Sequence, residues 1–259
     1  MTLPSNVSVV MPAYNAAATI SMALESIRLQ EIAVQEVVVV DDGSSDATVE
    51  IVESWRDRLP LTVIRNDRNL GICASLQRGV EAAQSEWIFR IDADDRWLPL
   101  HTKNLLPFCE DDSVSIVSAR ARYLDPEGSF LSLTRIVSDE DVRARLLWDN
   151  PLVHSATGFR RAAYDSVGGY GPSNECQDYY LWTRLLELGR LGYSPIPSVD
   201  YLVMPNSLSR KPKKLAFRSR WGSQADAIGR FWSRHPLWAA ACSIAALSRL
   251  ALYRLHILN

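Results

Sequence analysis

Apolar and polar residues alternate along the first hundred residues in a way that predicts repeated strand–helix units. Short apolar runs indicate strands, and stretches with apolar residues at helical spacing separate them. The run from Glu36 to Val40 holds four consecutive valines, which is typical of a strand buried in the centre of a parallel sheet. We therefore expect a doubly wound sheet with right-handed crossovers. The expected strands are 7–11, 36–40, 61–64 and 87–91, and the expected helices are 17–29, one following 46, and 71–83.

The pattern changes after Pro99, where strand and helix signals no longer alternate regularly. The sequence from here on predicts a strand at 114–119, a hairpin at 122–133, a helix at 139–148, a strand at 153–159, a helix at 176–188 and a helical pattern from about 213. We expect one α/β domain over residues 1–205, divided into halves 1–98 and 99–205, followed by a helical tail over 206–259.

The composition is that of an ordinary folded soluble protein, with 47% hydrophobic and 22% charged residues among 259. Its four cysteines are far apart and form no ligand pairs, which indicates separate thiols rather than a disulfide framework or a zinc site. The N-terminus lacks the pattern of a signal peptide, so we expect a cytoplasmic protein.

The last fifty residues are strongly basic, whereas the rest of the chain is acidic. This segment either faces anionic material, such as phosphate, a membrane surface or nucleic acid, or forms a solvated basic helix. Its apolar run from Leu237 to Leu247 is too short to span a bilayer. Two readings stay open for it: an interfacial helix at a membrane surface, and a helix packed on the domain or on a second subunit.

The motif Asp92-Ala93-Asp94-Asp95 concentrates like charge directly after a predicted buried strand. Ionised carboxylates repel one another at such a spacing, and a divalent cation relieves that repulsion. Mg²⁺ in particular takes one or two carboxylates and completes its shell with substrate phosphates and water. The alternative is a turn with a helix cap. The strand end nevertheless suits a phosphate–metal site, because ligands of such sheets bind at the carboxyl ends of the strands.

A second polar cluster, Asp41-Asp42-Gly43-Ser44-Ser45-Asp46, ends the all-valine strand. A carboxylate here can accept hydrogen bonds from a base or from ribose hydroxyls, and Gly43 lets the backbone turn sharply beside it. We expect Asp46 to cap the following helix and Asp42 to bind a ligand.

Several motifs in order resemble glycosyltransferase family 2. They are residues 8–15 (SVVMPAYN), 39–48 (VVDDGSSDAT), 68–71 (RNLG), 90–95 (RIDADD), 150–155 (NPLVHS), 159–161 (FRR), 168–170 (GGY) and 177–185 (QDYYLWTRL). The resemblance covers about four-fifths of the chain, and the order of the motifs makes it specific. It implies a GT-A fold, in which a central mixed, mostly parallel sheet binds a nucleotide sugar, and an inverting transfer of the sugar.

The resemblance also implies roles for individual residues. Tyr14 and Asp42 would hold the base, Asp92 would lie near the ribose, and Asp94 would ligate a Mg²⁺ or Mn²⁺ ion on the diphosphate. The full set implied for the nucleotide sugar is Pro12, Tyr14, Asn15, Asp41, Asp42, Asn69, Asp92 and Ala93.

On the acceptor side, Asp178 matches the general base of the family, and Gln177 replaces the glutamate that usually precedes it. Without the resemblance, Asp178 would be interpreted as an acid in the first turn of a helix. We also place His154 and Trp182 on the acceptor side, although a structural histidine bonded to a backbone carbonyl is an equal alternative for His154.

The family often carries an Arg and a His where this chain has Leu202 and Met204, so a phosphate contact is either missing or supplied by Arg210 and Lys211. The sequence thus predicts a glycosyltransferase. Its expected partners are a UDP-, dTDP- or GDP-linked donor and a saccharide or lipid-linked acceptor. The alternative is a catalytically degenerate nucleotide-binding scaffold.

A nucleotidyltransferase is disfavoured, because residues 12–17 form no Gly-rich basic loop. No nucleic-acid partner is expected, because the tail lacks a recognition motif. Contact of the tail with the inner face of the membrane and homo-oligomerisation are further expectations.

Overall fold

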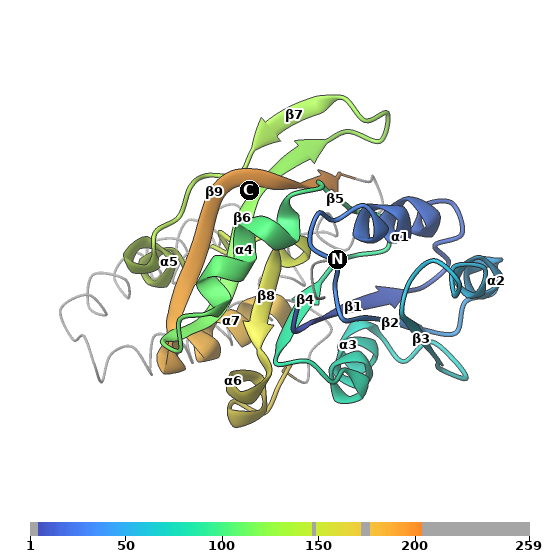
Figure 1. The fold of residues 1–259 in the computed structure, drawn as a ribbon, viewed down its shortest axis with the longest axis horizontal. Helices are drawn as coiled ribbons and strands as arrows, with labels where there is room; N and C mark the ends of the chain where they lie inside the picture. Colours follow the sequence, from blue (N-terminus) through green and yellow to red (C-terminus); the bar gives the residue numbers. More distant parts are fainter. Residues whose placement is uncertain (1–4, 147–148, 172–176, 204–259) are drawn as a thin grey trace, which may run out of the picture.

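The computed structural model describes residues 5–146, 149–171 and 177–203 (Figure 1). Strands and helices alternate at first, as predicted, with β1 Val7–Ala13, α1 Ile20–Arg28, β2 Glu36–Asp41, α2 Thr48–Glu53, β3 Leu61–Arg65, α3 Ile72–Ala82 and β4 Trp87–Arg90. The later elements are β5 Arg96–Trp97, α4 His101–Cys109, β6 Val114–Leu124, β7 Phe130–Leu133, α5 Asp139–Leu146, a 3₁₀ turn η1 His154–Ala156, β8 Thr157–Arg160, α6 Arg161–Ser166, α7 Gln177–Leu188 and β9 Arg190–Leu202.

The described strands form one mixed sheet in the order β3-β2-β1-β4-β8-β6-β9-β5, with β7 paired to β6. Strands β1 to β4 are parallel, so their carboxyl ends meet at one edge. Strand β8 runs antiparallel to both β4 and β6 and joins the two halves. Strand β9 runs parallel to β6 over nearly its whole length.

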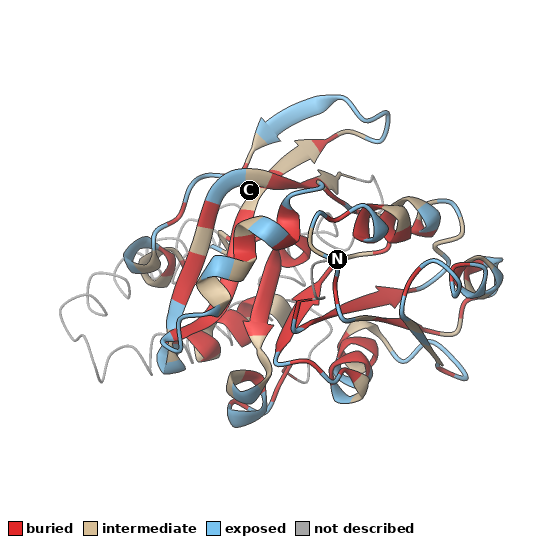
Figure 2. Ribbon diagram, in the orientation of Figure 1, coloured by how far each residue is buried: buried red, intermediate tan, exposed pale blue. Residues whose placement is uncertain are grey.

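Helices cover both faces of the sheet, and the valines of β2 show why. Val37 and Val39 belong to the buried cluster that includes residues of α1, α2 and α4 on one face of the sheet. Val38 and Val40 belong to the cluster on the other face, which includes residues of α3, α5, α6 and α7. All four are completely buried, which matches the prediction of a strand enclosed on both faces. Figure 2 shows this buried centre, with exposure concentrated on the outer helices and on the β6–β7 hairpin.

The sequence missed α4, α6, β5 and β9 and misplaced one functional residue. His154 was expected on a strand but lies on the 3₁₀ turn η1, and β8 begins only at Thr157. Asp46 is not the N-cap residue of α2, which is Ala47, although its carboxylate accepts a 3.0 Å hydrogen bond from the Thr48 N–H.

The expected tail over 206–259 and the sites of Met204, Arg210 and Lys211 lie outside the described residues. Within the described ranges, no helix has the length and apolar character that a membrane span requires.

Candidate functional site

The carboxyl ends of β1, β2 and β3 bring three polar segments together. The Asp42 N–H donates to the Ala13 carbonyl at 2.8 Å, and the Asn66 N–H donates to the Asp41 carbonyl at 2.8 Å. These two bonds connect the carboxyl ends of β1, β2 and β3 at the positions where each strand's apolar residues give way to polar ones. This places the residues after β2 beside residues 66–71, which we call the β3–α3 loop.

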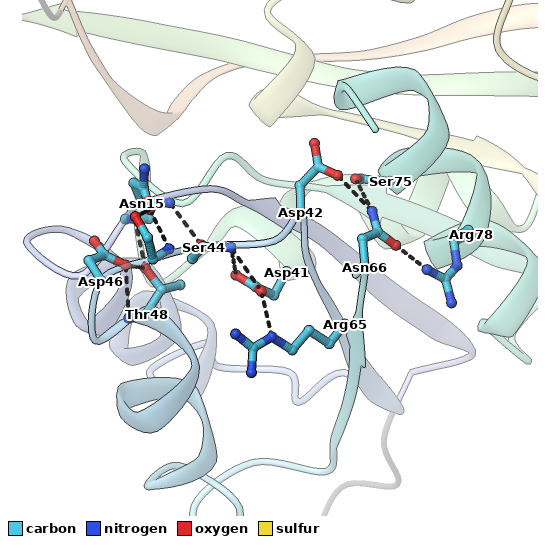
Figure 3. A network of polar contacts seen from close by, with 12 residues as sticks. Asn15, Asp41, Asp42, Ser44, Asp46, Thr48, Arg65, Asn66, Ser75 and Arg78 are labelled. Carbon is cyan, nitrogen blue, oxygen red and sulfur yellow. Dashed lines mark hydrogen bonds and ion pairs between the residues drawn. The ribbon is translucent and has the colours of Figure 1, made fainter. Parts of the chain in front are cut away.

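The Asp42 carboxylate holds the β3–α3 loop in place, and Figure 3 shows its contact with Asn66. One carboxylate oxygen accepts hydrogen bonds from the Asn66 side chain at 2.7 Å and from the Leu70 N–H at 2.8 Å. The other accepts the Gly71 N–H at 2.9 Å. Asn66 is itself buried and bonds to Ser75 at 3.1 Å and to Arg78. The Asp42 carboxylate is therefore fixed in one orientation by hydrogen bonds to the β3–α3 loop, and Asn66 connects this network to α3.

Asn15 and Asp41 shape the turn after β2. Asn15, at a positive φ of 49°, accepts a 2.9 Å hydrogen bond from the Ser45 N–H and donates its own N–H to the Ser44 hydroxyl at 2.9 Å. The buried Asp41 carboxylate accepts the Ser44 N–H and lies 3.6 Å from Arg65. Both residues thus support the turn.

The other residues expected to bind the donor differ in their exposure. Tyr14 is 52% exposed and offers a free aromatic face beside this turn. Pro12 is buried in β1 opposite Val40, and Ala93 is buried after β4. Asn69 accepts the Gly71 N–H at 3.1 Å and so also belongs to the β3–α3 loop.

The acidic loop, residues 92–95, follows β4 and is organised by a buried arginine. Arg90 is 1% exposed, and its guanidinium bonds to both carboxylate oxygens of Asp92 and to the Ser155 hydroxyl at 3.2 Å. Ser155 also accepts the Asp92 N–H at 3.0 Å. Because Ser155 precedes β8, this cluster ties the acidic loop to the second half of the domain.

The acidic loop suits a divalent cation. Asp92, Asp94 and Asp95 each offer an oxygen within 4.8 Å of the others. Burial, together with repulsion from Asp92, raises the pKa of Asp94 to about 6, and burial with repulsion from Asp92 and Asp94 raises the pKa of Asp95. One Asp95 oxygen is buried without a hydrogen-bond partner among the described residues. A cation supplies the positive charge that these groups lack.

Asp178 lies in the first turn of α7 with its carboxylate held at both oxygens. The Asn150 side chain donates to one oxygen at 2.6 Å, and the Tyr179 N–H donates to the other at 2.8 Å. Burial raises the pKa of this carboxyl group, and the Tyr179 N–H and the Arg90 charge oppose that rise. The group therefore has the features of a base with a raised pKa that is held in one geometry.

His154 and Trp182 are buried in the core rather than exposed in an open cleft. His154 is buried, bonds to the Tyr170 hydroxyl at 3.0 Å and packs edge-on against Trp182 with ring centroids 5.4 Å apart. Burial holds the pKa of His154 well below its ordinary value, so the ring is neutral. Trp182 is completely buried and so offers no surface to a ligand, whereas Gln177 is partly exposed.

Sequence analysis missed the residues that hold the predicted site residues in place. Arg90 and Ser155 were seen only as parts of motifs, and Asn66 was not singled out at all. Two features of the sequence could have identified Arg90 and Asn66. Arg90 is a charged residue in the otherwise apolar β4 run, and Asn66 is an asparagine directly after β3.

Comparison with known proteins finds a matching family model and several similar sequences. The model of the family described as Glycosyl transferase family 2 matches residues 8–168. The amylovoran biosynthesis glycosyltransferase AmsE of Erwinia amylovora is 28% identical over 172 residues, which are 66% of this chain and 65% of AmsE. A UDP-Gal:alpha-D-GlcNAc-diphosphoundecaprenol beta-1,3-galactosyltransferase of Escherichia coli is 26% identical over 64% of this chain and 62% of its own. The chain thus spans a little under two thirds of these relatives.

Two solved structures have a similar fold. S. aureus TarS 1–349 in complex with UDP-GlcNAc superposes with a TM-score of 0.72 at 21% identity, over 86% of this chain and 66% of that one. The mannosyltransferase PcManGT from Pyrobaculum calidifontis, in complex with GDP-Man and Mn²⁺, gives 0.63 at 22% identity, over 99% and 83% of the two chains. The predicted GT-A-like α/β fold is therefore confirmed.

Proposed function

Because the chain belongs to glycosyl transferase family 2, we propose that it moves a sugar from a nucleoside-diphosphate donor to a hydroxyl group, with inversion at the sugar carbon. The acceptor is a saccharide or a lipid-linked saccharide. The observation that carries this proposal is the acidic loop, whose three carboxylates converge just after β4. The loop follows a strand of the same parallel set as β2, which Asp42 follows, and the charge of Asp92 acts on Asp178.

The donor half is proposed to bind the nucleotide through Tyr14 and the β3–α3 loop. The exposed Tyr14 ring can stack on a base, and Asp42, through its bonds to Leu70 and Gly71, fixes the loop that borders the base. Both Asp92 oxygens are engaged by Arg90, which leaves Asp94 and the unpartnered Asp95 oxygen as the best ligands for Mg²⁺ or Mn²⁺. When bound, the ion stabilises the negative charge of the leaving diphosphate.

The acceptor half is proposed to supply the base. An acceptor hydroxyl is a poor nucleophile, so a carboxylate within hydrogen-bond reach takes its proton as the hydroxyl attacks the sugar carbon. Asp178 is held by Asn150 and Tyr179, and Coulomb interaction with Asp92 and Arg90 reaches it, which supports its position at the same site. Attack opposite the leaving diphosphate inverts the configuration.

The test is a thermal-shift panel of UDP-, GDP-, dTDP- and CMP-sugars, each with and without Mg²⁺ or Mn²⁺. A ligand that binds only the folded state raises apparent stability by mass action. We expect one nucleotide to raise the melting temperature only with metal, and Asp94→Ala to abolish that rise. Asp57→Ala, at an exposed acid outside the site, is the matched control and should respond as the wild type does.

A second readout separates the enzyme from the degenerate scaffold. Release of the nucleoside diphosphate is measured with the responding donor, with and without candidate saccharide acceptors. Binding that never leads to release would support the scaffold, whereas the absence of any nucleotide shift would refute the donor site itself.

A further inference from the structure

The β6–β7 hairpin presents a strand edge without a strand partner in the described part of the chain. Among the described residues, β7 pairs with β6 alone, and the hairpin projects from the body of the domain at the top of Figure 1. An unpaired edge presents a row of N–H and C=O groups that can pair with another strand. Within residues 5–146, 149–171 and 177–203, the outer edge of β7 thus has no strand partner.

The side chains of β7 expose apolar surface next to this edge. Phe130 is 60% exposed and Leu131 is 52% exposed. Figure 2 shows β7 coloured as exposed along most of its length. Leu124 pairs with Phe130 and Tyr123 with Ser132, so Leu131 is the extra residue at a shift of the register. Two large apolar side chains are thus exposed at consecutive positions of this strand.

The other two edges of the sheet are better protected. Strand β3 carries exposed Thr62 and Arg65, and β5 is only two residues long. Natural edge strands are commonly protected by charge, proline, bulges or shortness. Strand β7, with the sequence Phe-Leu-Ser-Leu, has no charge and no proline, and it is twice as long as β5, although its register with β6 shifts once.

The charges at the two ends of β7 are opposite. The turn before the strand carries Asp125 and the exposed Glu127, and the exposed Arg135 follows it. When two such strands lie antiparallel about a two-fold axis, the acidic turn of one copy falls beside Arg135 of the other. In the described part of the chain, Glu127 and Arg135 form no ion pair within their own copy.

We propose that the protein forms a homodimer in which β7 pairs antiparallel with β7 of a second copy and extends the sheet across the two-fold axis. Phe130 and Leu131 are covered in the pair, and Glu127 and Arg135 face each other twice. A membrane surface fits less well, because anionic headgroups repel the acids at the tip of the hairpin.

The small area of a single strand pair makes this a weak dimer, so it is measured as a function of concentration. Analytical ultracentrifugation of the full chain, from low to high micromolar concentration, should show a monomer–dimer equilibrium for the wild type. Leu131→Lys should raise the dissociation constant by about tenfold or more, the loss expected from one buried leucine. Leu29→Lys, at a 51% exposed leucine ending α1, is the matched control and should not change it.

Charge reversal gives an independent test of the antiparallel arrangement. Glu127→Arg and Arg135→Glu should each weaken the dimer, and the double variant should restore it, because the pair is rebuilt with reversed signs. Thermal melting establishes that each variant remains folded. A wild type that stays monomeric overturns the proposal, as does a dimer that Leu131→Lys leaves intact. Vesicle binding by a monomer, lost in Leu131→Lys, would assign the edge to a membrane instead.

Discussion

The proposed base, Asp178, shows how single contacts tune the chemistry of one side chain. Burial raises the pKa of its carboxyl group, and the hydrogen bond from the Tyr179 N–H at 2.8 Å opposes that rise. The Asn150 side chain donates a second bond at 2.6 Å, and a donor of this kind favours the ionised form. A base works only when ionised, so the rate should fall as the pH drops below this raised pKa. The contact with Asn150 therefore sets part of the working pH range.

Replacing Asn150 tests this argument. Asn150→Ala removes a donor to the charged form, so the pKa of Asp178 should rise and the acidic limb of the kcat/KM profile should move to higher pH. Asp178→Asn should lower kcat by about 10²–10⁴-fold and leave donor binding unchanged. A pH series of diphosphate release measures both. An unmoved acidic limb in Asn150→Ala would show that Asp178 is not the group that titrates.

The sequence predicted the acidic residues of the site but not the residues that hold them. Asp92 and Asp94 stand out because three acids in four residues follow an apolar run. The partners Arg90–Ser155 and Asp178–Asn150 are separated by 65 and 28 positions, and only the antiparallel entry of β8 and the packing of α7 bring them together. Trp182 was expected at the acceptor and is instead buried, because chemical type alone does not reveal which face of a helix meets the core.

At the scale of elements, the helices and strands that the sequence predicts correctly are those with a regular pattern of apolar residues. Strands β1 to β4 were found because they are short apolar runs between clear helices. Strand β9 was missed because Pro195 and Pro197 argue against a strand, and the structure tolerates them where the register with β6 shifts. Helix α4 was missed for a related reason, since Pro107 lies within it.

The turn after β2 requires a glycine at position 43. Gly43 has a φ of 74°, and a Cβ atom there would lie 2.7 Å from the Arg68 carbonyl carbon and 2.8 Å from its Cα. Gly43→Ala should therefore push the β3–α3 loop away from Asp42. We expect a stability loss beyond the roughly 1–2 kcal/mol that a positive φ costs alanine, together with weaker nucleotide binding.

Gly128 provides the matched control for this change. Its φ is 86°, but nothing lies within 4 Å of an added Cβ atom. Gly128→Ala should therefore lose only the roughly 1–2 kcal/mol of stability that a positive φ costs alanine, and its nucleotide affinity should stay unchanged. Denaturant unfolding and donor titration measure both effects, and equal losses in the two variants would show that contact with the β3–α3 loop is unimportant.

At the scale of the whole molecule, the two halves share their cores. Val10 and Val38 of the first half belong to the same buried cluster as Phe159 and Leu185 of the second. On the other face, the cluster runs from β1 through Trp97 to Val199. We therefore expect the described domain to unfold as one cooperative unit, so that a single buried group can control the stability of the whole.

His101 is such a group. It is completely buried at the start of α4, its Nδ1 lies 2.9 Å from the Ser198 hydroxyl, and its ring packs on Trp97 with centroids 4.3 Å apart. Burial lowers its pKa from 6.5 to about 3. Between pH 6.5 and about 3, His101 is protonated in the unfolded chain but neutral in the folded chain. The free energy of unfolding therefore falls as the pH drops through this window.

The loss from this group approaches about 1.4 kcal/mol for each pH unit below about 6. Asp94 and Asp178, whose pKa values are raised, act in the opposite direction, because the folded protein binds their protons more tightly. The effect of His101 is therefore isolated by comparison with His101→Gln, which keeps every carboxylate and replaces the titrating ring with a neutral amide. Denaturant unfolding from pH 7 to pH 4.5 should show a steeper decline for the wild type than for the variant. Parallel declines would mean that His101 can take up its proton within the folded state, and hence that the junction of β5, α4 and β9 opens readily to water.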